Sequence, residues 1–287
     1  MCKTWSALSA VPQRIVSALC FMLLFFGGDC YAERHALRVS DGKIISFGRM
    51  MEEIKGTRVV VVGENHDNIG HHQIQQAVIE AFHQAETPLS IGLEMFRAGF
   101  QPMLDHWVAG TLDETGFIRV YAENWGLPWP LYSEIFLYAR SHKIPLVGLN
   151  LEQNIAAKVA RQGFASLTPK ELAKLPPGIT CNVDPVYLSF IKRSFSTHLK
   201  DEKTFIRFCE AQKLWNMYMA SQVINHLKKY PQQTMVVIAG AGHALKGGIP
   251  AEIGHASRLS CKVILPEFTE LTRNSVTLDD ADYLIIE

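Results

Sequence analysis

The sequence predicts an α/β fold: a mostly parallel sheet with helices on both faces, and one helical excursion. Four short apolar runs without alternation indicate strands that are covered on both faces. Helical stretches separate the runs, which is the order of a doubly wound parallel sheet. Each run also ends in a polar group. The runs are residues 58–64 (RVVVVGE), 89–94 (LSIGLE), 144–150 (IPLVGLN) and 234–243 (TMVVIAGAGH).

The first half of the chain alternates strands with helices. A helix is predicted over residues 70–85, because apolar side chains recur there at three- and four-residue spacing (Ile74, Ala77, Val78, Ala81 and Phe82). Prolines and aromatic residues crowd residues 121–130 (YAENWGLPWP), which predicts a loop. The other elements expected here are an edge strand at 43–47, helical turns at 48–54, and helices at 100–109, 113–121 and 131–142.

The second half contains the helical excursion, which we expect at about residues 160–205. Residues 166–185 carry four prolines and no long periodic segment, which favours an excursion from the sheet over a second domain. The other elements predicted here are helices at 151–162 and 205–230, and strands at 234–239, 262–265 and 283–286.

Composition limits the class of protein. The 287 residues are 48% hydrophobic, which suits one large domain. The formal net charge is zero, so no basic excess points to nucleic acid as a partner.

The N-terminus predicts a secretory signal peptide over residues 1–32. Lys3 and Arg14 precede an apolar stretch at 15–26, and Cys30-Tyr31-Ala32 resembles a small-x-small cleavage site. We therefore expect a periplasmic or membrane-associated extracytoplasmic protein, with residues 33–287 as its single domain. An uncleaved anchor and lipoprotein processing at Cys30 stay open, although Asp29 stands where a small neutral residue is expected.

The cysteines do not form a disulfide framework. Cleavage after Ala32 leaves Cys181, Cys209 and Cys261, an odd and scattered set whose pairing the sequence leaves open. The chain has no CxxCH segment, which excludes a covalent c-type haem site.

Polar side chains follow the ends of the predicted strands. In a parallel sheet the carboxyl ends of the strands open onto one edge, where ligands bind. We therefore expect Glu64, His66, Glu94, Asn150 and His243 to meet in one crevice.

This crevice has residues suited to catalysis or metal binding. A buried carboxylate is costly unless it is paired, protonated or bound to metal, so Glu64 and Glu94 are predicted as functional. As a catalytic set we predict Glu64, His66, Glu94 and His243. As ligands of a divalent metal we predict Glu64, His66 and His243. His71 and His72 follow on the next predicted helix, and at most one of them is expected to face the site. His72 is expected to lie in solvent at the start of that helix.

Aromatic and amide side chains form a second group of candidates. Tyr121, Trp125, Trp129, Tyr132 and Tyr138 are expected either to line a planar apolar ligand or to be ordinary core aromatics. Gln212 and Asn216 lie one turn apart on the longest predicted helix, and either line the crevice or satisfy each other in the core.

Six segments together carry a family resemblance, in order along most of residues 58–243. The chain resembles the ChaN-like haem-binding proteins, an iron-uptake group of the haem-binding uptake/Tiki superfamily. Residues 153–203 and those after Leu245 diverge. The matching segments are 63–72 (GENHDNIGHH), 91–96 (IGLEMF), 101–110 (QPMLDHWVAG), 129–150 (WPLYSEIFLYARSHKIPLVGLN), 208–220 (FCEAQKLWNMYMA) and 236–243 (VVIAGAGH).

The resemblance implies non-covalent haem binding with a tyrosine on the iron. It points to Tyr132 as that ligand, with Tyr121 and Tyr187 as alternatives. The cofactor-binding residues expected on this basis are Tyr132, Tyr121, Trp129 and Gln212. It further implies a homodimer with two haems face to face, and outer-membrane haem uptake machinery as a partner.

Two functions follow from these observations. The first is an exported haem-binding protein in haem and iron uptake. The alternative is a metal-dependent hydrolase of peptides or esters that uses Glu64, His66, Glu94 and His243, as the wider superfamily includes hydrolases with similar motifs.

Overall fold

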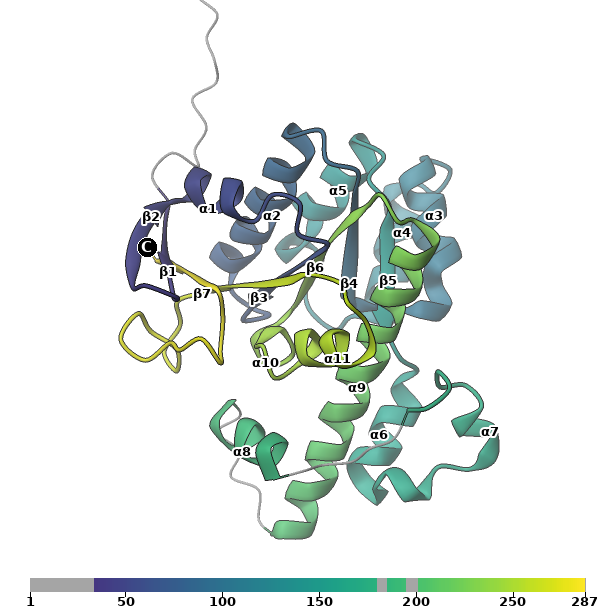
Figure 1. Ribbon diagram of the computed structural model, residues 1–287. Helices are drawn as coiled ribbons and strands as arrows, with labels where there is room; N and C mark the ends of the chain where they lie inside the picture. Colours follow the sequence, from purple (N-terminus) through teal and green to yellow (C-terminus); the bar gives the residue numbers. More distant parts are fainter. Residues whose placement is uncertain (1–33, 180–184, 195–200, 287) are drawn as a thin grey trace, which may run out of the picture. The chain divides into compact units, whose positions relative to one another are not determined.

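A computed structural model describes residues 34–179, 185–194 and 201–286. In these ranges eight strands form one sheet in the order β2-β1-β8-β7-β3-β6-β4-β5 (Figure 1). The strands are β1 (His35–Arg38), β2 (Lys43–Ser46), β3 (Val59–Glu64), β4 (Leu89–Arg97), β5 (Leu146–Asn150), β6 (Thr234–Gly240), β7 (Cys261–Pro266) and β8 (Tyr283–Ile286). The predicted signal peptide lies outside the described residues.

The centre of the sheet is parallel, which confirms the predicted α/β fold. β6 pairs with β3 on one side and with β4 on the other, and all residues of β3 and β6 are buried. Burial on both faces explains why these segments are continuous apolar runs. At one edge, β1 runs antiparallel to both β8 and β2, so the sheet is mixed.

Helices cover both faces of this sheet (Figure 1). On one face, Val60, Val62 and their neighbours pack against α1 to α5, and on the other, Val59 and Val61 pack against α8 to α11. The α-helices are α1 (Phe47–Glu53), α2 (Ile69–Gln84), α3 (Gln101–Ala109), α4 (Glu114–Asn124), α5 (Ser133–Ser141), α6 (Gln153–Gln162), α7 (Pro169–Leu172), α8 (Pro185–Ser194), α9 (Glu202–Lys229), α10 (Ala241–Ala244) and α11 (Ile249–Ala256). Three 3-10 turns are η1 (Ala98–Phe100), η2 (Trp129–Leu131) and η3 (Phe164–Ser166).

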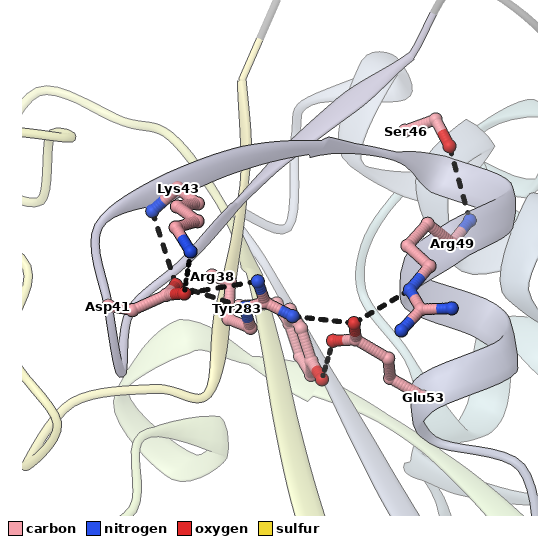
Figure 2. A network of polar contacts seen from close by, with 7 residues as sticks. All are labelled: Arg38, Asp41, Lys43, Ser46, Arg49, Glu53 and Tyr283. Carbon is pink, nitrogen blue, oxygen red and sulfur yellow. Dashed lines mark hydrogen bonds and ion pairs between the residues drawn. The ribbon is translucent and has the colours of Figure 1, made fainter.

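A polar network fastens the antiparallel edge to α1 (Figure 2). Glu53 on α1 accepts hydrogen bonds from Arg38 of β1, at 2.6 Å, and from the Tyr283 hydroxyl of β8, at 3.1 Å. Arg49, one turn earlier on α1, donates to the same carboxylate at 2.9 Å. The Ser46 hydroxyl caps the helix by accepting from the Arg49 amide. One carboxylate thus joins two strands and a helix.

The structure departs from the expected elements in a few places. β1 was not predicted, and the predicted helix at 131–142 is split into η2 and α5. The predicted excursion contains η3, α7 and α8. At its start, apolar side chains of α6 and of the segment that follows it pack with α9 in one cluster. Cys209 and Cys261 are free thiols, while Cys181 lies outside the described ranges.

Candidate functional site

Three neighbouring strands bring the predicted residues to one edge of the sheet. Glu64, the last residue of β3, is in register with Gly240 at the end of β6. On the other side of β6, Leu93 of β4 pairs with Ile238, and Glu94 follows directly. The Gly240 amide donates to Oε2 of Glu94 at 2.6 Å. The convergence predicted from the strand ends is therefore confirmed for both glutamates and for the segment that carries His243.

Glu64 is the centre of a buried polar cluster. Its Oε1 accepts from the Tyr132 hydroxyl at 2.5 Å and from Nδ1 of His66 at 2.7 Å, and its Oε2 lies 3.3 Å from Nε2 of His72. Burial alone would raise the pKa of Glu64, but hydrogen bonds from His66, His72 and Tyr132 outweigh it and lower this pKa to about 2. Glu64 is therefore a buried, ionised carboxylate that orients the groups around it.

The first turn of α2 contributes more to this cluster than expected. The prediction of a solvated His72 is wrong, because the side chain is 2% exposed and its ring lies 4.1 Å from that of Tyr132, measured between centroids. His71 is also buried, and its Nδ1 accepts from the Asn65 amide, which holds the loop after β3. His72 thus faces Glu64, while His71 has a structural role.

His243 is held on the opposite side of the edge. The segment that carries His243 is the single helical turn α10, directly after β6. Nδ1 of His243 donates to Oδ1 of Asn216 on α9 at 2.7 Å, and its Nε2 lies 3.7 Å from Oε1 of Glu94. Because an amide oxygen only accepts, Nδ1 carries the proton and Nε2 is the basic atom of the neutral ring.

The two imidazoles differ in their preferred charge. Burial works against the charged form of His66, but its hydrogen bond to Glu64 and the charge of Glu94 raise its pKa above 6.5. Burial lowers the pKa of His243, and the nearby Glu94 only partly offsets this. One edge therefore carries two imidazoles whose pKa values are shifted in opposite directions.

Gly240 is required by the close approach of His66. A Cβ at this position would lie 2.6 Å from Cε1 of the His66 ring, which no real contact allows. The other side of the imidazole is bounded by Trp125, whose ring meets it edge-on at 5.0 Å between centroids. His66 is therefore held between the glycine of β6 and the loop after α4.

A cavity of about 1150 Å³ opens above these groups. Its polar floor includes Glu64, His66, Gln212 and His243, and its apolar wall is formed by Trp125, Leu127, Leu245, Phe268 and Leu271. The wall residues from the segment after β7 were not predicted. Because β7 is parallel to β3, the segment that follows it arrives at the same edge, and this could have identified them.

Comparison with known proteins gives this site a family. The sequence profile of the group described as haem-binding uptake, Tiki superfamily, ChaN matches residues 50–253. The chain belongs to the ChaN family. No match was found among curated proteins.

One solved structure of a ChaN protein shares this fold, and two others show weaker similarity. The chain is 21% identical to ChaN of Campylobacter jejuni, described with cofacial haem binding, with a TM-score of 0.70 over 88% of this chain and 96% of that one. The type III effector HopBA1 is 12% identical, with a TM-score of 0.46 over 77% of this chain and 82% of that one. An erythromycin esterase EreC mutant is 13% identical, with a TM-score of 0.49 over 88% and 82%. None of the described helices combines the length and apolar character needed to cross a bilayer.

The aromatic residues predicted to bind the cofactor lie mostly in the core of this ChaN-family chain. Tyr132 and Tyr121 are 0% and 1% exposed, and neither lines the cavity. Burial and the charge of Glu64 raise the pKa of both phenols, which disfavours the phenolate that ligates ferric iron. Trp129 packs among Trp107, Phe117 and Phe136. The geometry therefore argues against Tyr132 or Tyr121 as the iron ligand.

Two side-chain amides that were predicted near the site, Gln212 and Asn150, differ in whether they line the cavity. Gln212 lines the cavity, which is the first of the two positions predicted for it, and its Oε1 is buried without a hydrogen-bond partner in the described part of the chain. Asn150 lies at the end of β5 and donates to the Glu94 carbonyl, which fixes the neighbouring strand.

The predicted divalent metal site does not form. Within the described ranges, no group of three or more His, Cys, Asp or Glu side chains is arranged to hold a metal ion. The reason is that each carboxylate is already engaged: Glu64 with His66 and Tyr132, and Glu94 with the Gly240 amide. Of the predicted set, Glu64 and His66 are hydrogen-bonded to each other, and His243 is hydrogen-bonded to Asn216.

Proposed function

We propose that this protein binds haem non-covalently in the cavity at the end of the sheet, as an exported component of haem and iron uptake. The observation that carries the proposal is the cavity itself, which has an apolar wall over a floor of imidazoles. Its volume of about 1150 Å³ exceeds that of pockets for drug-sized ligands, which is ~300–1000 Å³. Membership of the ChaN family supports the same ligand.

The lining suits a haem in its chemistry. Trp125, Leu127 and Phe268 offer aromatic and aliphatic surface to the flat macrocycle. His66 and His243 offer ring nitrogens that bind iron or hydrogen-bond to its other ligands. Bound haem would supply the iron centre, and the chain supplies apolar contact, exclusion of water and oriented imidazoles.

We propose a tyrosine as the iron ligand, as the resemblance to the family implies. Tyr132 and Tyr121 are enclosed in the core, so the remaining candidate of the three is Tyr187, which belongs to α8. α8 packs beside the α10 segment, because Phe190 contacts Gly247, four residues after His243. Phe190 also belongs to the same apolar cluster as Leu245 of the cavity wall, and this supports α8, with Tyr187, as the source of the ligand.

Titration of the purified protein with hemin tests the proposal. We expect saturable binding at one haem per chain, with a Soret shift and a phenolate-to-iron charge-transfer band. Tyr187→Phe should remove that band, and Tyr132→Phe is the matched control that should keep it. A wild-type Soret shift without that band, which His66→Ala alone abolishes, would replace tyrosine by histidine as the ligand. Absence of any Soret shift would reject haem binding.

Export and assembly belong to the same proposal. The predicted signal peptide at residues 1–32 supports an extracytoplasmic location, where outer-membrane haem uptake machinery would be the partner. The cofacial haem binding named for the Campylobacter protein supports a homodimer with haem. Sedimentation with and without hemin should show a haem-dependent dimer, and an unchanged monomer would reject this part.

Two imidazoles at one edge, with pKa values shifted in opposite directions, favour a second candidate function, hydrolysis of an ester or peptide by acid–base catalysis. Nε2 of neutral His243, oriented by Asn216, would take a proton from water, and protonated His66 would donate one to the leaving group. Turnover of a chromogenic ester should then be lost in both His243→Gln and His66→Gln. A rate equal to that of buffer would remove this candidate.

A further inference from the structure

The cavity lining has acidic side chains but no lysine or arginine among the described residues. The acidic residues that line it are Glu64, Asp67, Glu270 and Asp280. Lysines adjacent in sequence to lining residues are paired elsewhere. Lys213 contacts Glu252 at 2.5 Å, and Lys246 contacts Asp282 at 3.2 Å. Asp67 and Glu270 are both exposed, so they lie where the cavity meets solvent.

The hydrogen-bonding groups of the floor carry the same bias toward acceptors. Gln212 is only 6% exposed, and its Oε1 has no partner within the described part of the chain. Three donors at the floor that could bind an anion already donate hydrogen bonds within the protein. Nδ1 of His66 donates to Glu64, Nδ1 of His243 donates to Asn216, and the Gly240 amide donates to Glu94. An anion entering the cavity would therefore meet mostly acceptors and like charge, and Nε2 of His66 would be a donor to it when that ring is protonated.

Haem has one edge with apolar substituents and another with two propionates. The apolar wall suits the first edge, because burial of apolar surface is favourable. A propionate beside Asp67 or Glu270 would be repelled, with no guanidinium or ammonium group in the described lining to pair with it.

We propose that haem enters this cavity apolar edge first and is recognised by its macrocycle and iron, while both propionates stay in solvent beyond the acidic rim. The inference rests on the proposed haem-binding function. According to this inference, the negative charge of the propionates weakens haem binding. The site would therefore also bind tetrapyrroles whose carboxylates are neutralised.

The test compares hemin with hemin dimethyl ester, in the same cosolvent, on the full-length protein. The ester should bind at least as tightly as hemin. Raising NaCl from about 20 to 200 mM should tighten hemin binding, because salt screens repulsion between charges. The affinity for the ester should change little.

A substitution at the rim makes the test sharper. Glu270→Gln should tighten hemin binding by about two- to fivefold, the range of one exposed charge interaction. It should leave the ester unchanged. Glu134→Gln is the control, since Glu134 is exposed on α5 and does not line the cavity.

The outcomes separate this inference from the proposal on which it rests. Tenfold weaker binding of the ester, or hemin binding that weakens with salt, would overturn the inference and leave haem binding intact. Binding of neither porphyrin would reject the proposed function, and the inference with it.

Discussion

Two glutamates in this molecule make similar bonds in different surroundings. Glu53, at the antiparallel edge, accepts from the Tyr283 hydroxyl at 3.1 Å and from Arg38 and Arg49 at 2.6 and 2.9 Å (Figure 2). Glu64, at the floor of the cavity, accepts from the Tyr132 hydroxyl at 2.5 Å and from His66 at 2.7 Å, with His72 at 3.3 Å. Each carboxylate thus has one phenol and two nitrogen partners.

The difference lies in the kind of nitrogen and in burial. Guanidinium groups stay protonated at any relevant pH, so the Glu53 network is a fixed fastening between strands and helix. Imidazoles exchange a proton near neutral pH, so the Glu64 cluster can change its charge. Because the Glu64 side chain is fully enclosed, the ionised carboxylate depends entirely on its partners. The comparison indicates that the edge network has a fixed charge, whereas the charge of the cavity cluster can follow the protonation of His66.

The largest expected effect comes from neutralising each carboxylate in turn. Glu64→Gln should lower the free energy of unfolding by about 3–5 kcal/mol, as expected when one partner of a buried ion pair is removed. Glu53→Gln should lower it much less, because the Arg38 and Arg49 side chains keep contact with solvent. Urea denaturation of both variants at pH 7 measures the difference. Equal losses would show that burial does not distinguish the two clusters.

Acid unfolding separates the clusters by pH. The pKa of Glu64 is lowered from 4.5 to about 2, so its contribution to stability is complete above pH 4.5 and is lost as the pH falls toward 2. This shift corresponds to stability on the order of 3 kcal/mol. Over that interval the unfolding free energy of Glu64→Gln should fall less steeply than that of the wild type. Denaturant titrations at several pH values, with Glu53→Gln as control, make the measurement; parallel curves for Glu64→Gln and wild type would contradict it.

The strands of this fold were predictable because their pattern is local. In the run VVVVGE every position before the final Glu64 is apolar, which is typical of a strand covered on both faces. The convergence of Glu64 and Glu94 followed from the parallel order of the strands, with no knowledge of side-chain contacts. β1 was missed because four residues with two buried side chains carry too little pattern.

The positions of side chains around Glu64 were not predictable in the same way. His72 was expected in solvent because helix starts are often exposed. It is buried because α2 begins five residues after Glu64 and packs back on the strand that it follows. The family resemblance predicted that Tyr132 binds the iron, but in the structure its hydroxyl donates a hydrogen bond to Glu64. Such roles depend on which buried acceptor lies within reach, which only the tertiary structure determines.

A smaller effect is expected from removing each phenol oxygen. Tyr132→Phe deletes a bond to a buried charged group and should cost about 1.5–3 kcal/mol of unfolding free energy. Tyr283→Phe deletes a longer bond to a carboxylate shared with two arginines, and should cost about 0.5 kcal/mol or less. Chemical denaturation of the matched pair gives both values.

Tyr132→Phe also has a readout beyond stability. With one donor fewer, the Glu64 carboxylate interacts more strongly with His66, so the pKa of His66 should rise further, which NMR titration of the ring protons measures. Tyr283→Phe should leave that pKa unchanged, since its hydroxyl bonds to Glu53. If Tyr132→Phe lowered the pKa of His66, the hydroxyl would not be competing for the Glu64 carboxylate. The two clusters would then differ in burial alone, and the proton on His66 would be controlled by Glu94 instead.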